Sequence, residues 1–310
     1  MAITPPALDS PDLVRLGAGH FHGGCAFCHG TPGTPVSPIA RHMLPSPPNL
    51  TTSMRPWKDE ELFWIVQHGI KYTGMPGWVA LEREDEIWAV VAFLKRIQSL
   101  DAESYAALAL GSVRIPGQTG EKLATIESNP QGAGACARCH GAESSGPATA
   151  LVPVLHGQTT EFLMTALHEY AQGTRRSGIM QPLAAELGAD DIRSLAEYYA
   201  KLAPLKPRAT NNAVNDRGRR LAIEGDTANG IPACNVCHGR DALASYPRLG
   251  GQNTAYMAGQ LRLWNNGHHT STDGAAIMAP IARRLSDGDI DAVTSYLSGL
   301  AAEPVGASRP

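Results

Sequence analysis

The sequence has few aromatic residues, no run of basic residues and no long apolar stretch. Phe, Trp and Tyr make up only 6% of the chain, whereas hydrophobic residues reach 43%, which is ordinary for a globular protein. A core with so few aromatic rings leaves room for a group that is not a side chain. The formal net charge is −3, and the lack of a basic stripe argues against nucleic acid as a partner.

Membrane-spanning and targeting segments are also missing from the pattern. No stretch approaches the roughly 18–20 uninterrupted apolar residues of a transmembrane helix. The first residues, Met1-Ala-Ile-Thr-Pro-Pro, lack the basic and apolar regions of a signal peptide. We therefore expect either a cytosolic protein or an exported one whose signal has been removed.

Cysteine occurs in one short motif and nowhere else. All six cysteines belong to three copies of Cys-x-x-Cys-His, at residues 25–29, 136–140 and 234–238. The copies are parts of longer repeats. A shift of 98 residues carries Cys136-x-x-Cys139-His140 onto Cys234-x-x-Cys237-His238, and the same shift carries Met180 onto Met278. Between these anchors Gly157-Gln158 matches Gly251-Gln252 at a shift of 94, because loops absorb small deletions and insertions.

The first third of the chain repeats the same order of features more loosely. A Pro-x-Leu follows each Cys-x-x-Cys-His, at residues 48–50, 153–155 and 247–249, and a methionine follows later in each third. We therefore predict three domains, at residues 1–112, 113–209 and 210–310, with linkers near 101–116 and 203–215.

Apolar spacing predicts helices and gives no convincing alternating strand. An amphipathic helix is expected at the end of each repeat, with Ile87, Ile192 and Ile290 on the apolar faces and acidic residues at its start. A middle helix is expected at 58–69, 159–172 and 253–266, each closing near a glycine. The predicted fold class is all-α.

Cys-x-x-Cys-His is the attachment motif of c-type haem. Its two thiols form thioether bonds with the haem vinyl groups, and the histidine binds the iron from one face. The motif predicts attachment at Cys25, Cys28, Cys136, Cys139, Cys234 and Cys237, with His29, His140 and His238 as iron ligands. Three alternatives fit the sequence less well. A thioredoxin-type redox pair normally occurs once, in a βαβ setting, and a zinc site usually joins two Cys-x-x-Cys units. A structural disulfide would not require the histidine that follows each pair.

One methionine per repeat is expected to fill the sixth iron position. Met75, Met180 and Met278 lie 46, 40 and 40 residues after the motif histidines, beside or close to a proline. A thioether ligand favours ferrous iron and raises the reduction potential. Met43 and Met54 remain rivals to Met75, and His42 is the histidine to reconsider if Met75 fails. Met164 and Met257 are expected to fill core gaps instead.

The Pro-x-Leu motif has an expected role beside the histidine. An iron-bound histidine generally donates its other ring N–H to a carbonyl, which fixes the ring orientation. We predict that the acceptors are the carbonyls of Pro48, Pro153 and Pro247.

In this order of motifs the sequence resembles class I cytochrome c over nearly its whole length. The second and third repeats together resemble periplasmic dihaem cytochrome c of the c-four type, through motifs that include Leu155-x-Gly157-Gln158 and Leu249-x-Gly251-Gln252. The first repeat, with Gly74-Met75-Pro76-Gly77-Trp78, resembles single-haem domains of oxidase and dehydrogenase subunits. The resemblance implies three tandem class I cytochrome c domains, each a small helical fold around a covalent haem c.

The function that the resemblance implies is electron transfer without catalysis. A tri-haem c-type cytochrome would exchange electrons with a dehydrogenase, a quinol-oxidising complex or a terminal oxidase. It would act in the bacterial periplasm, since haem ligation to this motif follows export, with possible peripheral attachment to the membrane. The alternatives are an electron-transfer subunit of a membrane-associated complex and a haem enzyme of the peroxidase or thiosulfate-oxidising type.

Overall fold

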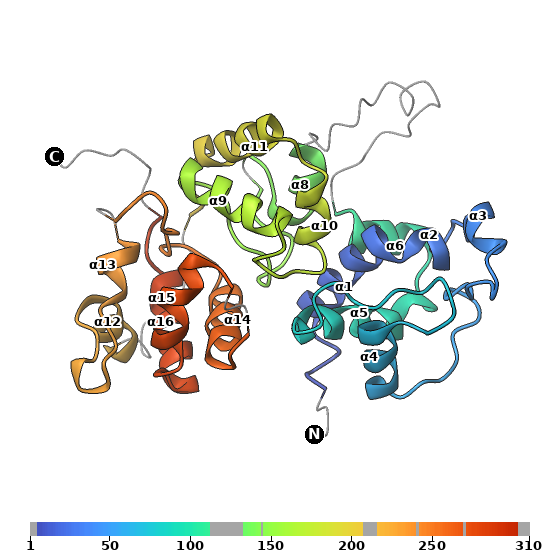
Figure 1. Ribbon diagram of the computed structural model, residues 1–310, viewed down its shortest axis with the longest axis horizontal. Helices are drawn as coiled ribbons and strands as arrows, with labels where there is room; N and C mark the ends of the chain where they lie inside the picture. The colour runs from blue at the N-terminus through green and yellow to red at the C-terminus, as the bar shows by residue number, and fades with distance from the viewer. Residues whose placement is uncertain are drawn as a thin grey trace. The chain divides into compact units, whose positions relative to one another are not determined.

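The computed structural model describes residues 5–111, 133–143, 145–206, 216–239, 242–268 and 271–302 (Figure 1). The described residues divide between two compact units. Those within Met1–Leu123 and Arg176–Met180 make up the first, and those within Ala124–Arg175 and Gln181–Pro310 make up the second. The predicted boundaries after residues 112 and 209, and the linker residues 112–116 and 207–215, lie outside the described ranges, so the division into three domains stays a prediction.

The first unit consists of helices joined by loops, together with the short segment 176–180. The helices are α1 (Pro11–Gly24), α2 (Ala26–His29), α3 (Pro38–Arg41), α4 (Asp59–His68), α5 (Glu84–Ile97) and α6 (Ala102–Ala109). Helix α5 contacts both α1 and α4, and α6 contacts α1 (Figure 1). Their shared core includes Phe21, Phe63 and Phe93, which are fully buried.

The second unit contains the helices of the second and third repeats. From the second repeat come α8 (Ala133–His140), α9 (Thr160–Ala171), most of α10 (Met180–Ala185) and α11 (Ala189–Lys201). The third repeat supplies α12 (Asp216–Ile223), the 3₁₀ turn η2 (Thr227–Asn229), α13 (Cys234–His238), α14 (Thr254–Asn265), α15 (Asp273–Ala282) and α16 (Asp287–Ser298). Helix α9 packs on α11, and α16 packs on α12 and α14.

The all-α prediction is confirmed, since the described residues contain no strand and only three isolated bridges. The expected final helices are α5, α11 and α16, and their buried faces include Ile87, Ile192 and Ile290. The expected middle helices are α4, α9 and α14. The spacing of apolar residues predicted them well because each has one face against a core. No helix in the described ranges is long and apolar enough to cross a membrane.

Part of the first predicted linker is helical instead of irregular. Helix α6 occupies Ala102–Ala109, and the side chain of Asp101 caps it by accepting from the Ser104 N–H. Tyr105 is buried against the first core, and its hydroxyl lies 2.9 Å from His22 Nδ1. The prediction missed α6 because two turns are too short for a clear period, and because packing on α1 supplies the stability that an isolated short helix lacks.

Two pairs of helices cross at a glycine that permits close backbone approach. A Cβ at Gly17 of α1 would lie 1.8 Å from the Ala89 carbonyl oxygen of α5. A Cβ at Gly218 of α12 would lie 2.2 Å from the Ala292 carbonyl oxygen of α16. In the first and third repeats, the helix before the motif and the last helix of the repeat are therefore held close together, which sets the position of the cysteines that follow α1 and α12.

Candidate functional site

Each Cys-x-x-Cys-His motif lies on a short helical turn. Cys25 precedes α2 as its N-cap residue, Cys136 and Cys139 lie in α8, and Cys234 begins α13. All six cysteines are free thiols and partly buried. A helical turn places residues i and i+3 on one face, so the two thiols of each motif can reach the same edge of one planar group.

The first thiol of each motif also lacks the character of a redox-active cysteine. Burial raises the pKa of Cys25 to about 12 and that of Cys234 to about 11, and it also raises the pKa of Cys136. Catalytic dithiols need a lowered thiol pKa, because the thiolate is the reactive form. Across the described ranges, no group of three or more His, Cys, Asp or Glu side chains is arranged to hold a metal ion.

Each motif histidine hydrogen bonds to the proline carbonyl that the sequence predicted. The distances from Nδ1 to the carbonyl oxygen are 2.9 Å for His29 and Pro48, 3.2 Å for His140 and Pro153, and 2.9 Å for His238 and Pro247. The prediction of these acceptors is confirmed. Because Nδ1 carries the proton in this bond, the Nε2 lone pair of each ring is available to a metal ion.

Burial keeps two of these rings neutral. Desolvation lowers the pKa of His140 and of His238 below the ordinary value, although the hydrogen bonds to Pro153 and Pro247 work in the opposite direction. A neutral imidazole is the form that binds a metal. The rings of Tyr199 and His140 are inclined at 71° with centroids 6.5 Å apart, and the Tyr199 hydroxyl donates to the Gly141 carbonyl at 3.0 Å. These contacts help to hold the His140 ring and the backbone after it in place.

The three predicted methionine ligands occupy different local structures. Met75 lies in the loop between α4 and α5, Met180 begins α10, and Met278 lies inside α15. All three are partly buried. The backbone N–H of Met75 donates to Thr73 Oγ1 at 3.1 Å, and that of Met180 donates to Ser177 Oγ at 3.0 Å. The assignment of these methionines to iron stays a prediction.

Four other methionines pack against neighbouring segments, and the choice of Met75 over Met43 and Met54 stays a prediction. Met43 Cε lies 1.9 Å from the position that a Cβ on Gly74 would take, so Met43 packs beside the Met75 loop. Met54 packs against the first core. Met257 is buried in the core of the third repeat and Met164 packs on that of the second, as expected of gap-filling residues.

A buried carboxylate organises the loop that follows Met75. Glu86 is 4% exposed and lies in the first unit with all of its partners. It accepts from Trp78 Nε1 at 3.1 Å, Ser177 Oγ at 2.6 Å, the Gly178 N–H at 2.6 Å and Arg83 Nη1 at 3.0 Å. Trp78 follows Met75 by three residues, and Gly178 precedes Met180 by two. One carboxylate therefore anchors both methionine-bearing segments.

Two buried glutamines have a role that the sequence pattern does not reveal. Gln158 and Gln252 occupy matching places in the second and third repeats, and each is only 5% exposed. Each hydrogen bonds to the backbone of the other repeat. Their shared Leu-x-Gly-Gln motif was the available signal, but a repeat pattern does not reveal a partner about 90 residues away.

These features fit haem c at the level of donor chemistry. Every motif combines two thiols on one helical turn with a histidine whose Nδ1 is already bonded to a carbonyl. The thiols can attach a porphyrin covalently, and the remaining ring nitrogen can bind its iron. The residues that the sequence predicted as attachment points and proximal ligands are thus brought together in each repeat.

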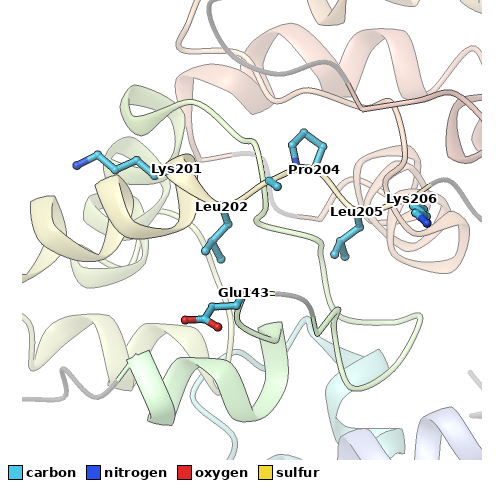
Figure 2. Close-up of a pocket in the computed structure, with 7 residues that line it drawn as sticks. Glu143, Lys201, Leu202, Pro204, Leu205 and Lys206 are labelled. Carbon is cyan, nitrogen blue, oxygen red and sulfur yellow. The ribbon is translucent and has the colours of Figure 1, made fainter.

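A separate pocket lies beside the end of α11. It has a volume of about 690 Å³ and is lined by Glu143, Lys201, Leu202, Ala203, Pro204, Leu205 and Lys206. Figure 2 shows Leu202 and Leu205 pointing toward the same space as Glu143. None of the lining residues is a predicted haem contact.

Comparisons with known proteins agree with this chemistry. Residues 12–94 match the family described as cytochrome c oxidase, cbb3-type, subunit III. The chain is 36% identical to a thiosulfate dehydrogenase electron acceptor of Thiomonas intermedia, over 58% of this chain and 83% of that protein. It is 36% identical to cytochrome c4 of Pseudomonas aeruginosa, over 54% of this chain and 85% of that protein. The solved structure of Acidithiobacillus ferrooxidans cytochrome c4 has a TM-score of 0.50 at 30% identity, and the match covers 54% of this chain and 99% of that one.

Proposed function

The chain belongs to the cytochrome c family, and from this premise we propose that it is a tri-haem electron carrier. The observation that carries the proposal is the recurrence of one arrangement in three places: two thiols on a helical turn and a histidine bonded through Nδ1 to a proline carbonyl. Haem c bound at these sites would supply one-electron chemistry, with its iron alternating between the ferric and ferrous states.

Each residue of a site has a distinct part in that function. The cysteine pairs Cys25/Cys28, Cys136/Cys139 and Cys234/Cys237 would attach the three haems. His29, His140 and His238 would bind iron through Nε2, and the proline carbonyls fix their orientation. Met75, Met180 and Met278 would complete the coordination. An iron whose coordination is completed by a histidine and a methionine would leave no place for a substrate, which would favour electron transfer over catalysis.

The ligand assignment can be tested by replacing the methionines one at a time. Met75→Leu, Met180→Leu and Met278→Leu should each remove about one third of the absorption that is specific to methionine-bound ferric haem. Each should also let carbon monoxide bind rapidly to one reduced haem. Met43→Leu is the matched control for Met75→Leu and should change neither property. If Met43→Leu opens the site and Met75→Leu does not, Met43 is the ligand. If no single replacement has an effect, methionine ligation is wrong.

The compartment and partners follow from the same family membership. We infer a periplasmic location, because haem is attached to Cys-x-x-Cys-His after export in bacteria, and donors and acceptors that are redox proteins at or near the inner membrane. Fractionation of cells that produce the chain should recover haem-bearing protein from the periplasm. Haem-bearing protein confined to the cytoplasmic fraction would contradict this inference.

A more specific role has support from one observation. Two relatives, 36% and 34% identical, are named as electron acceptors of thiosulfate dehydrogenase. We therefore propose, as a second candidate, that this chain accepts electrons from a dehydrogenase of that kind. Mixing the oxidised chain with thiosulfate and catalytic amounts of a thiosulfate dehydrogenase should reduce its haems within seconds. If dithionite reduces the haems but this mixture does not, the chain is not an acceptor for that dehydrogenase, and only the proposal of a general electron carrier remains.

A further inference from the structure

Two buried glutamines in the second unit are arranged reciprocally. Gln158 Nε2 donates to the Arg248 carbonyl at 2.8 Å, and its Oε1 accepts from the Arg248 N–H at 2.9 Å. Gln252 Nε2 donates to the Val154 carbonyl at 3.0 Å, and its Oε1 accepts from the Val154 N–H at 2.8 Å. Each glutamine therefore holds both backbone groups of one residue in the other repeat, and both side chains are almost completely buried.

The residue that each glutamine holds comes directly after the proline that orients a histidine. The Pro153 carbonyl, which accepts from His140 Nδ1 at 3.2 Å, belongs to the same peptide group as the Val154 N–H. In the third repeat the Pro247 carbonyl, which accepts from His238 Nδ1 at 2.9 Å, shares its peptide group with the Arg248 N–H. Two continuous chains of hydrogen bonds result, one from His140 to Gln252 and one from His238 to Gln158.

The direction of these hydrogen bonds affects how strongly the histidine can donate to a metal. When Gln252 Oε1 accepts from the Val154 N–H, it polarises that peptide group and makes the Pro153 oxygen a stronger acceptor. A stronger acceptor draws the Nδ1 proton of His140 and makes Nε2 a better donor to a metal. Gln158 acts on His238 in the same way, through Arg248 and Pro247.

Neighbouring contacts keep the glutamines in this geometry. Asn253 Nδ2 donates to the Val152 carbonyl at 2.7 Å, and Thr159 Oγ1 donates to the Ala244 carbonyl. The Tyr256 N–H donates to the Ala150 carbonyl at 3.2 Å. These bonds fix the backbone that follows each glutamine to the other repeat, so the position of each glutamine is also held by its neighbours.

We propose that Gln158 and Gln252 are positioning residues that act across the two repeats, each setting the donor strength of the iron-binding histidine of the other repeat. The inference rests on the proposed function, since it takes His140 and His238 as iron ligands. It links the two haem sites of the second unit through the protein itself. An apolar residue of similar size would fill the same space but would break the chain to the distant histidine.

The test compares Gln252→Met and Gln158→Met in the full haem-bearing chain. Removing Gln252 should raise the midpoint potential of the haem at Cys136 and Cys139, in the other repeat, and leave that of the haem at Cys234 and Cys237 nearly unchanged. Removing Gln158 should raise the midpoint potential of the haem at Cys234 and Cys237 and leave that of the haem at Cys136 and Cys139 nearly unchanged. The assignment of each midpoint to its haem comes from the haem methyl resonances followed by NMR during the titration. Gln172→Met, at an exposed glutamine after α9, is the matched control and should shift neither potential.

Backbone hydrogen exchange gives a readout that does not depend on electron transfer. Gln252→Met should accelerate exchange of the Val154 amide by about tenfold, as expected for loss of one buried hydrogen bond, and leave the Arg248 amide as it is. Shifts confined to the haem of the mutated repeat, equal shifts at both haems, or no shift would each overturn the proposal. A wild-type chain without covalent haem would instead refute the proposed function, so the two failures can be told apart.

Discussion

Glu86 shows how much can depend on one buried side chain. Its carboxylate receives hydrogen bonds from Trp78, Ser177 and Gly178 and pairs with the buried guanidinium of Arg83. Every partner is a donor, so a carboxylate satisfies the group and a carboxamide cannot. The close approach of Gly178 to the Trp78 ring, where a Cβ would lie 2.2 Å from Cε2, leaves no space for rearrangement.

We expect Glu86→Gln to destabilise the protein by about 3 kcal/mol. The change removes the buried charge partner of Arg83, leaves only the half-exposed Asp85 to pair with it, and turns an amide NH2 group toward other donors. Asp85→Asn is the matched control: Asp85 also pairs with Arg83, but its side chain is 52% exposed, so a loss below about 1 kcal/mol is expected. Chemical denaturation followed by circular dichroism measures both. Equal effects of the two substitutions would contradict a special role for the buried carboxylate.

His156 predicts a pH dependence of stability. The side chain is 2% exposed, and burial lowers its pKa, although Nε2 donates to the Glu143 carbonyl at 3.2 Å. The unfolded chain therefore takes up a proton below a pH of about 6.5 that the folded chain resists, and the free energy of unfolding falls as the pH decreases. His156→Gln should remove this component, which is at most about 1.4 kcal/mol per pH unit. Identical pH profiles of the two proteins would show that His156 does not contribute.

At the scale of the helices, the crossing of α1 and α5 leaves no space for a side chain at Gly17. A Cβ at Gly17 would meet the Ala89 carbonyl oxygen and Phe93 Cβ, so the helices would have to separate. We expect Gly17→Ala to cost about 1–3 kcal/mol, as overpacking does.

Gly24 gives the control within the same helix. A Cβ there meets nothing within 4 Å, and alanine favours a helix over glycine by up to about 1 kcal/mol. Gly24→Ala should therefore be neutral or slightly stabilising in the same denaturation experiment. A comparable loss in both variants would mean that helix propensity, and not the crossing, decides the result.

The helices differ in how well the sequence predicts them. Helices α5, α11 and α16 have long apolar faces and acidic first turns. The spacing of their apolar residues and the position of their acidic residues therefore predict the same helix. No helix was predicted at α1 or α12: glycine and histidine interrupt α1, and α12 carries three arginines over eight residues. Both are stabilised by the last helix of their repeat, which a local pattern does not reveal.

At the scale of the whole molecule, the three attachment motifs predict independent loading. Each motif has its own cysteine pair, histidine and proline carbonyl, and shares none of them with another motif. The double substitutions Cys25→Ala/Cys28→Ala, Cys136→Ala/Cys139→Ala and Cys234→Ala/Cys237→Ala should each remove one haem from the mass of the purified chain and one step from its redox titration. Loss of all haem from any one variant would show that loading is coupled.

The cysteine motifs are enough to predict the chemistry of this protein. Six cysteines in three Cys-x-x-Cys-His motifs indicate covalent haem, and the proline carbonyls beside the histidines were predictable because that contact depends on a motif of fixed order. The tertiary structure alone decided which side chains connect the sites. Gln252 meets Val154 and Glu86 meets Gly178 across more than 90 residues of chain. Contacts of that kind depend on how already folded helices and loops pack, so no periodicity or local spacing could specify them.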